Sequence, residues 1–522
     1  MCYVGTRAER QEPVISLRRS LPWRCLISGP DLDLLTHLHE LTIRRLNRLL
    51  VILSLSLTRN IHLFELFAPN FVATVGEGLA RSRPFGGSGR LISCGVNRRR
   101  LEGGEEMRGR LWFLGCALGI VILTLGSPQC FGAGFAIWEG SARGTALGQA
   151  EVGRADDPSA LFYNPAGITQ LPGLQVMAGG AAILLSTEIN NPHFGSQTTN
   201  ADWGFPPHLY VTYQCNDRLY FGLGVFTPFG LSVEFPRNWF GAFNSYDAEV
   251  TSVTINPNVA FKITDQLSIA AGLEAMEFGL TLKQLINPVA PFPLPPALAP
   301  SLNLEGSSWG YGYNLAVHYK PCELFSMGIS YRSQVKQSAS LGTDLDTAGD
   351  RLVAHTDVDT SVTLPDSIAF GLALYPMKCL SWEIGGVWTQ WSKFNALTFA
   401  FAQPILGFPS VTSLKNWHDT WRFQTGVEYK VTPCLDLRAG YIYDEEAINS
   451  QFADYLLPSN NRNYFSVGPG FHWGKWTLDL SYTYLLVQDR DVTHSLSAGY
   501  VNPSMLSDGN ANIIAASLGY KF

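Results

Sequence analysis

Two arginines with the chemistry to bind a carboxylate stand out in the C-terminal part of the chain. Arg438, and after it Arg422, lies on the polar side of a segment in which apolar and polar residues alternate. An unpaired charge in a dry cavity is costly, so an apolar molecule with an anionic head needs a positive group of this kind. The same guanidinium groups could instead form salt bridges that stiffen their surroundings, and both roles stay open. Four acidic residues nearby in sequence could be the partners: Asp419, Glu428, Asp436 and Asp444.

Other residue types with catalytic potential lack the context that catalysis needs. Residues 306–310 read Gly-Ser-Ser-Trp-Gly and match Gly-x-Ser-x-Gly, which forms a nucleophile elbow only between a buried strand and a helix. Here the pattern opens a glycine-rich segment with strand alternation, so a lipase is the weakest alternative. No phosphate-binding loop or dinucleotide fingerprint occurs, and we expect no enzyme, cofactor, metal or nucleic-acid partner. Four histidines stand singly, without metal-ligand spacing: His208, His318, His418 and His472.

The elements that carry these residues have the pattern of β-strands. Charged residues are 15% of the chain, against about 25% in a typical soluble domain. From residue 134 onward no apolar run approaches the ~18–20 residues of a membrane helix. Residues 421–429, 435–443 and 476–484 instead alternate between apolar and polar side chains. Alternation alone would also fit a soluble β-sandwich, but aromatic residues near the strand ends favour a membrane barrel.

The connections between these segments alternate between short and long. Short turns are expected near 214–217, 263–266, 320–323, 376–379, 431–434 and 474–475. Long loops are expected near 189–205, 232–248, 283–306, 337–359, 395–416, 447–461 and 489–509. These connections predict an all-β, antiparallel transmembrane barrel of about 14 strands, with both chain ends on the short-turn side. Pro228, just after the third strand, and Pro257, within the fourth, could interrupt a ladder.

The N-terminal third divides into three parts before the barrel. Residues 1–106 contain 15 Arg and no Lys, and we interpret them as a non-native extension whose true start is Met107. Residues 107–133 have two arginines and a fifteen-residue apolar run, the pattern of a signal peptide. Residues 134–172 alternate turn formers with short helix-compatible pieces and need a surface to pack on. The predicted barrel, residues 173–522, encloses such a surface.

A weak repeat marks four of the short turns. Each has a cysteine, and a glycine follows within a few residues on the next strand. The turns are roughly 10 Å apart by strand spacing, beyond the reach of a disulfide, so free thiols are favoured over disulfides. The cysteines are Cys215, Cys322, Cys379 and Cys434, and the glycines are Gly222, Gly328, Gly385 and Gly440.

Motifs spread over about residues 134–522 resemble the FadL-type outer-membrane transporters of long-chain fatty acids and hydrophobic compounds. An acidic pair, Asp156-Asp157, and Asn164-Pro165-Ala166 precede the first strand. Further matching stretches are Thr227 to Leu231, Leu364 to Ser367, Trp388 to Ser392, Asp419 to Arg422 with Gly426, and Arg438 to Gly440 with Asp444. One position departs from the family, because an amide, Asn461, stands before Arg462 where an acid is frequent. That departure weakens any inference about charge pairing there.

The resemblance implies a fourteen-stranded barrel in the outer membrane of a Gram-negative bacterium, with residues 134–172 as a hatch inside it. It implies capture of a hydrophobic ligand in an outer groove, luminal binding, and release by hatch movement and a lateral opening near the third strand. Asn164, Pro165 and Ala166 match the hatch motif, and the apolar loop residues Phe292, Leu294 and Leu298 are candidates for the groove. Arg438 and Arg422 are then candidates for the ligand carboxylate.

Two other non-enzymatic functions are alternatives to fatty acid transport. A channel of this fold for aromatic hydrocarbons would need no carboxylate partner, and sequence does not separate that cargo from fatty acids. A general diffusion porin would have no use for a segment inside its lumen. The expected partners are outer-membrane lipids and, through the terminal Phe522, the barrel-assembly machinery.

Overall fold

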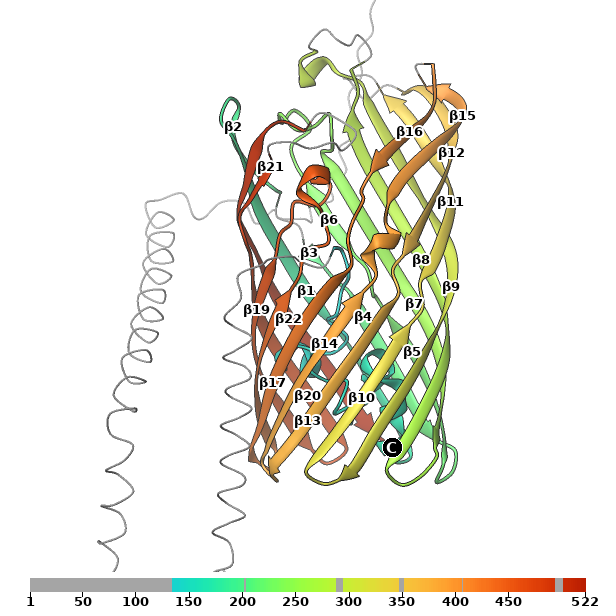
Figure 1. Ribbon diagram of the computed structural model, residues 1–522, viewed down its shortest axis with the longest axis vertical. Helices are drawn as coiled ribbons and strands as arrows, with labels where there is room; N and C mark the ends of the chain where they lie inside the picture. Colours follow the sequence, from blue (N-terminus) through green and yellow to red (C-terminus); the bar gives the residue numbers. More distant parts are fainter. Residues whose placement is uncertain (1–133, 201–202, 288–293, 347–351, 406, 493–500) are drawn as a thin grey trace, which may run out of the picture. The chain divides into compact units, whose positions relative to one another are not determined.

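The computed structural model describes residues 134–522 except 201–202, 288–293, 347–351, 406 and 493–500 (Figure 1). The proposed extension 1–106 and signal peptide 107–133 lie outside the described residues. Within those residues, none of the helices has the length and apolar character needed to cross a bilayer.

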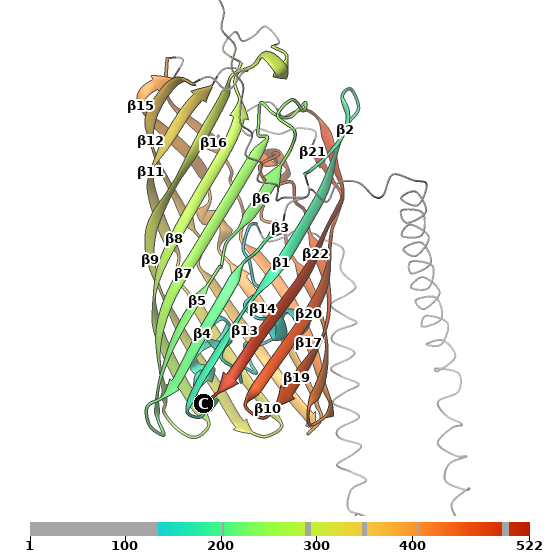
Figure 2. The same ribbon diagram turned by 180° about the vertical axis from the view of Figure 1, so that it is seen from behind.

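The described strands form one antiparallel sheet that closes on itself (Figures 1 and 2). Fourteen strands follow one another around the described barrel, and the last, β22, pairs with β1 from Gln175–Lys521 to Asn190–Met505. The predicted strand number and antiparallel order are therefore confirmed. In order, the fourteen are β1 (Leu174–Asn191), β4 (Pro207–Gln214), β5 (Leu219–Phe226), β7 (Asp247–Lys262), β8 (Leu267–Leu285), β9 (Ser301–Cys322), β10 (Phe325–Arg332), β13 (Ser367–Met377), β14 (Leu380–Thr389), β17 (Thr420–Thr432), β18 (Leu435–Asp444), β19 (Arg462–Trp473), β20 (Trp476–Val487) and β22 (Ser504–Lys521).

Further elements extend or connect these strands. The additional strands are β2 (Gly195–Thr198), β3 (Trp203–Gly204), β6 (Leu231–Glu234), β11 (Val335–Asp346), β12 (Leu352–Leu364), β15 (Ala396–Ile405), β16 (Phe408–Leu414) and β21 (Arg490–Val492). The helical turns are α3 (Ala142–Ala146), α4 (Ala160–Tyr163), η1 (Pro165–Gln170), η2 (Pro296–Leu298), η3 (Trp391–Lys393) and η4 (Ser450–Phe452).

The barrel wall is apolar outside and polar inside. Along β7, buried and exposed residues alternate over nearly the whole strand. Val253, Ile255 and Val259 are about two-fifths exposed on the outer face, whereas Asn256 and Asn258 are buried facing the lumen. This arrangement is the reverse of a water-soluble sandwich, and it is what a hydrocarbon surrounding requires because closure leaves no unpaired sheet edge.

The predicted turns agree with the structure better than the predicted long loops. All six short connections occur where alternation ends, and the four cysteines there are free thiols. The expected loops 337–359 and 395–416 were wrong in part, because their residues form the hairpins β11–β12 and β15–β16. Leu341, Thr343 and Leu345 alternate inward on β11, so strand pairing extends beyond the membrane-facing wall.

The sheet is interrupted at the third strand. β5 ends at Phe226, and the chain resumes as β6 at Leu231, which pairs with β7. β3 pairs with β1, and no ladder joins β3 to β6 within the described residues. The interruption expected at Pro228 is therefore present. At Pro257 the β7–β8 ladder skips Asn256 and Pro257 and resumes at Asn258 in the same register, while β7 itself continues and stays paired with β5.

Candidate functional site

Residues 134–172, here called the luminal segment, lie inside the barrel (Figure 1). α3 contacts β18, β19, β20 and β22, while η1 contacts β5, β7, β8 and β9 on the other side of the lumen. Nearly all of its residues between Glu139 and Thr169 are buried. The segment spans the lumen, which gives it the packing surface that the sequence predicted it would need.

Glycines in the wall make room for the luminal segment. A Cβ on Gly440 would lie 2.0 Å from the backbone nitrogen of Gly148, and one on Gly328 would lie 2.1 Å from the carbonyl oxygen of Val152. A Cβ on Gly222 would lie 2.3 Å from the Leu161 side chain. Three of the four glycines in the sequence repeat thus touch the segment, so the repeat marked its docking surface.

Replacement of Gly440 by alanine is expected to displace the luminal segment. Overpacking of a close contact costs about 1–3 kcal/mol, and here the clash is with backbone that cannot rotate away. The thermal unfolding midpoint should fall, and limited proteolysis should cut the segment faster. Gly342→Ala is the matched control, because its nearest atom is a His355 carbon at 3.6 Å. Equal behaviour of the two variants would contradict tight docking at β18.

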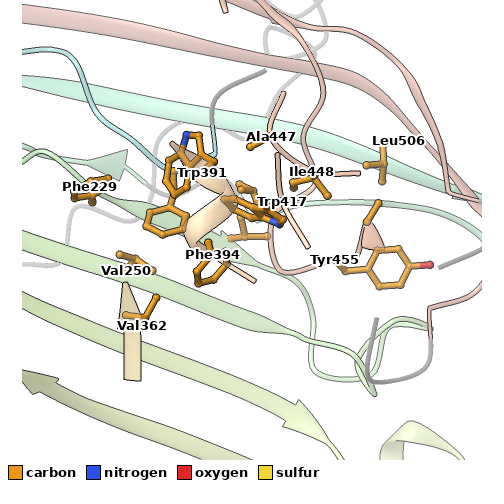
Figure 3. Close-up of a cluster of buried hydrophobic side chains, with 14 of the residues drawn as sticks. Phe229, Val250, Val362, Trp391, Phe394, Trp417, Ala447, Ile448, Tyr455 and Leu506 are labelled. Atoms are coloured by element: carbon orange, nitrogen blue, oxygen red, sulfur yellow. The ribbon is translucent and has the colours of Figure 1, made fainter. Parts of the chain in front are cut away.

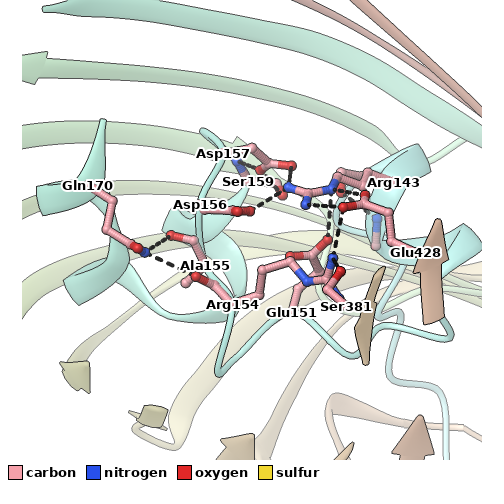
Figure 4. Close-up of polar contacts among 12 residues, drawn as sticks. Arg143, Glu151, Arg154, Ala155, Asp156, Asp157, Ser159, Gln170, Ser381 and Glu428 are labelled. Carbon is pink, nitrogen blue, oxygen red and sulfur yellow. Dashed lines mark hydrogen bonds and ion pairs between the residues drawn. The ribbon is translucent and has the colours of Figure 1, made fainter. Parts of the chain in front are cut away.

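A cluster of buried charges binds the luminal segment to the wall (Figure 4). The Glu428 carboxylate on β17 accepts hydrogen bonds from Arg143 Nε at 3.1 Å and from Arg154 Nη1 at 3.1 Å. Arg143 also contacts Asp156 at 2.6 Å and Asp157 at 3.2 Å within the segment. One wall carboxylate and two segment carboxylates therefore share the Arg143 guanidinium, an arrangement that fixes the geometry strongly.

The charges of this cluster stabilise one another against burial. Burial opposes the charged form of Arg143, but Asp156, Glu151 and Glu428 outweigh it and raise the pKa of Arg143. Burial likewise opposes ionisation of Asp156, yet Arg143 and Arg154 lower the pKa of Asp156. Both groups are thus charged at neutral pH, and the cluster is a set of ion pairs.

The two arginines proposed for a ligand carboxylate both have protein partners. Arg438, with a side chain 1% exposed, donates to Glu428 at 2.8 Å and to Asp479 at 2.6 Å. Arg422 donates to the Gln149 side chain at 2.6 Å. These contacts support the salt-bridge alternative, and a ligand role for either arginine stays a prediction.

The predicted hatch motif and the predicted groove residues do not lie together with the two arginines. Asn164 is fully buried, accepts from the Ala166 amide and donates to Val152 O at 2.9 Å, while Pro165 begins η1. The motif therefore turns the luminal segment and, through a hydrogen bond from Asn164 Nδ2 to Val317 O at 3.1 Å, joins it to β9 of the wall. Of the groove residues, Phe292 lies outside the described residues, Leu294 packs against buried side chains, and Leu298 on η2 is 65% exposed.

An apolar cavity is lined in part by a cluster of buried hydrophobic side chains, some of which Figure 3 shows. It has a volume of ≈ 70 Å³. Phe135 makes edge-to-face contacts with Trp391, at 5.0 Å between ring centroids, and with Trp417, at 5.9 Å. The cavity is also lined by Leu231, Val250, Phe278, Leu280, Val362, Phe394, Leu397 and Leu457.

One buried ion pair borders this apolar cavity. Lys415 Nζ donates to Asp454 at 2.5 Å, and the two side chains are 5% and 4% exposed. Lys415 follows β16 directly, and its amide donates to Asn395 O at 2.8 Å. Sequence reasoning missed Lys415 because it lies in a connection without periodicity. The only hint was its place directly before Asn416 and Trp417, an aromatic in an apolar loop.

A second cavity reaches the interruption of the sheet. It has a volume of ≈ 430 Å³ and is lined by β1, by residues 203–207, by residues 227–232 and by β7. Phe135 and Leu231 line both cavities. The two spaces are therefore neighbours, and the Phe135 ring lies between the apolar cavity and the gap between β3 and β6.

The chain is similar to proteins of a known family. A family model described as "Outer membrane protein transport protein (OMPP1/FadL/TodX)" matches residues 123–522. An outer membrane protein of Neisseria meningitidis is 27% identical over 470 residues, covering 78% of this chain and 99% of the relative. The long-chain fatty acid transport protein of Escherichia coli O6:H1 is 22% identical, covering 80% of this chain and 100% of the relative.

Solved structures share the fold. A FadL homologue of Pseudomonas aeruginosa superposes with a TM-score of 0.62 at 20% identity, covering 76% of this chain and 100% of that one. The toluene transporter TodX of Pseudomonas putida superposes with a TM-score of 0.59 at 16% identity, covering 76% and 99%.

Proposed function

This chain belongs to the OMPP1/FadL/TodX family of outer membrane transport proteins, and we propose that its cargo is a long-chain fatty acid or a similar hydrophobic anion. Members of this family transport hydrophobic molecules across the outer membrane of Gram-negative bacteria, and the proposal starts from that activity. Family membership makes the protein a transporter, and we infer that it catalyses no reaction.

The observation that carries the cargo proposal is the Lys415–Asp454 pair at the apolar cavity. A buried pair is costly to desolvate and is weak evidence for a stabilising role. A fatty acid carboxylate could replace Asp454 as the partner of Lys415, while its chain enters the apolar space. The site would thus offer a partner for the carboxylate and apolar walls for the part of the chain next to it.

The cargo would leave through the second cavity, which reaches the interruption of the sheet. Phe135 lies at the boundary between the two cavities, and β3 and β6 lack a shared ladder beside the second one. We infer that the luminal segment acts as the hatch, and that movement of its first residues opens the boundary. Signal cleavage near residue 133 would leave Phe135 close to the mature N-terminus, where such movement is least hindered.

Phe135→Ala is expected to speed release of bound cargo. The variant removes the ring between the cavities while Lys415 stays in place, so dissociation of a fluorescent fatty acid should become severalfold faster. Stopped-flow dilution of the loaded protein in detergent measures that rate. Phe261→Ala, on the lipid face of β7, is the control, since this side chain is 42% exposed. An unchanged rate for Phe135→Ala would place the exit elsewhere.

Uptake of a labelled long-chain fatty acid in a transporter-null strain tests the function. The wild-type chain should restore uptake, and Arg438→Ala, compared at equal folded amount, shows whether that arginine binds cargo or only the wall. If the wild type restores no uptake, the fatty acid assignment is wrong. If Arg438→Ala transports normally, only the ligand role of Arg438 is lost.

An aromatic hydrocarbon is the second candidate cargo. The cavity of ≈ 70 Å³ is lined by Phe135, Phe278, Phe394 and Trp417, a small aromatic space suited to a single ring. The related TodX is a toluene transporter by name. Binding of toluene with no binding of a fatty acid would favour this cargo. A porin is disfavoured because the luminal segment fills the lumen, and steady large currents in planar bilayers would restore that alternative.

Two partners follow from the same proposal. Phe522 ends an alternating strand, which is the recognition signal that we infer for the barrel-assembly machinery. Outer-membrane lipids would surround the apolar outer face.

A further inference from the structure

One half of the periplasmic rim carries exposed lysines that form no ion pair within 4.0 Å in the described residues. The six short turns and the end of β22 form this rim. Six of the ten lysines between residues 134 and 522 lie there. Four of them, here called the lysine arc, are exposed and lie in a turn or near the end of a strand, Lys378 and Lys475 in turns, Lys430 in β17 and Lys521 in β22. The lysine arc consists of Lys378, Lys430, Lys475 and Lys521.

The other half of the rim differs in its charge. Each of its three turns has a basic residue at or beside it and also one acidic residue, so the local charges cancel. The three pairs are Arg218 with Asp217, Lys262 with Asp265, and Lys320 with Glu323. Positive charge is therefore concentrated on one side of the rim, from β13 to β22.

No ion pair within 4.0 Å joins the lysine arc to a carboxylate of the described residues, although Asp436 lies opposite Lys430 in the β17–β18 ladder. The vestibule that Lys378, Lys430 and Lys521 border is also lined by carboxylates, among them Glu428, Asp436 and Asp479. In the part of the chain that the structure describes, the lysines with an ion pair within 4.0 Å are Lys283 and Lys415, neither of them in the arc. The wall carboxylates closest to the mouth, Asp436 and Asp479, contact Arg438.

Exposed aromatic side chains accompany the lysine arc on the lipid side. Trp473 is 47% exposed and Trp476 is 41% exposed. The Tyr520 ring packs between Trp476, at 4.6 Å, and Phe522, at 4.7 Å, and Lys475 Nζ lies 6.0 Å from its centroid. Aromatic rings of this kind mark the level of the lipid headgroups.

We propose that the lysine arc binds the phosphate groups of anionic phospholipids in the periplasmic leaflet. Neighbouring turns are roughly 10 Å apart, so each lysine can meet a separate headgroup, and a flexible lysine stem can reach outward over the rim. Lys378, Lys430 and Lys521 also border a luminal vestibule of ≈ 580 Å³. An acidic soluble protein could use the same charges, but the aromatic residues at this level favour lipid.

Fluorescence quenching by brominated lipids tests this proposal with the intact barrel. The protein is reconstituted in phosphatidylcholine vesicles that contain either brominated phosphatidylglycerol or brominated phosphatidylcholine. Trp473 and Trp476 report the nearby lipids, and the double variant Trp473→Phe/Trp476→Phe gives the background from other tryptophans. The wild type should prefer phosphatidylglycerol roughly fivefold per engaged lysine at low salt, and 0.5 M salt should reduce the preference.

Matched variants decide which charges carry the preference. Replacing all four arc lysines by glutamine should abolish it, and replacing them by arginine should retain it. The control replaces Arg218, Lys262 and Lys320 by glutamine and should retain the preference as well. Circular dichroism and heat-dependent electrophoretic mobility confirm that each variant is folded. A wild type without preference, or a glutamine variant of the arc that keeps it, would overturn the proposal and leave the arc to an acidic protein.

Discussion

Lys415→Met is expected to weaken binding of a long-chain fatty acid by about 10- to 100-fold. A hydrogen bond to a charged group contributes about 1.5–3 kcal/mol, and the methionine keeps the length of the side chain while removing its charge. Asp454 would lose its ion pair with Lys415, so the variant also tests whether the pair serves binding. Isothermal titration with palmitate in a non-ionic detergent measures the loss.

Two comparisons make the Lys415 result specific. Lys283→Met removes a lysine whose ion pair with Asp247 is 38% and 23% exposed, and it should bind palmitate like the wild type. Toluene has no charged head, so its affinity should change little in Lys415→Met. If palmitate and toluene weaken equally, Lys415 supports the cavity as a whole. If neither weakens, the carboxylate site lies elsewhere.

Glu428→Gln is expected to loosen the luminal segment and open an ion path. Arg143, Arg154 and Arg438 all donate to this one carboxylate. Breaking a buried ion pair by removing one partner costs about 3–5 kcal/mol, because the remaining charges stay buried without compensation. Since the segment fills the lumen, its release should raise single-channel conductance in planar bilayers well above the wild-type value.

The control for Glu428→Gln is a charge change of the same kind at the rim. Glu323→Gln alters an exposed turn residue and should leave conductance unchanged. The Gly440→Ala variant, which displaces the segment by steric means, should open the same path. A Glu428→Gln protein that folds, with wild-type conductance, would show that packing alone holds the segment.

The barrel could be predicted from the sequence because its wall follows one local rule. Each wall residue faces either lipid or lumen, so alternation in β18 and β20 is written directly in the chain. The short turns were located correctly because alternation stops there. The hairpins β11–β12 and β15–β16 were taken for loops because they lie between transmembrane strands, although each pairs segments that are close in sequence.

The site was harder to predict because it depends on contacts across the lumen. Arg438 and Arg422 were chosen for their place on polar faces, but sequence cannot show that Glu428, Asp479 and Gln149 already engage them. Lys415 belongs to a connection, and Asp454 comes from another connection 39 residues away. Only the closed barrel brings these two to one cavity.

The most direct test of the whole account is a crystal structure of the protein with a long-chain fatty acid. We predict the carboxylate within hydrogen-bond distance of Lys415 Nζ and the chain among Phe135, Phe278 and Val362, inside a closed barrel with residues 134–172 in its lumen. A ligand bound at Arg438 instead, or found only on the outer face of the barrel, would contradict the account.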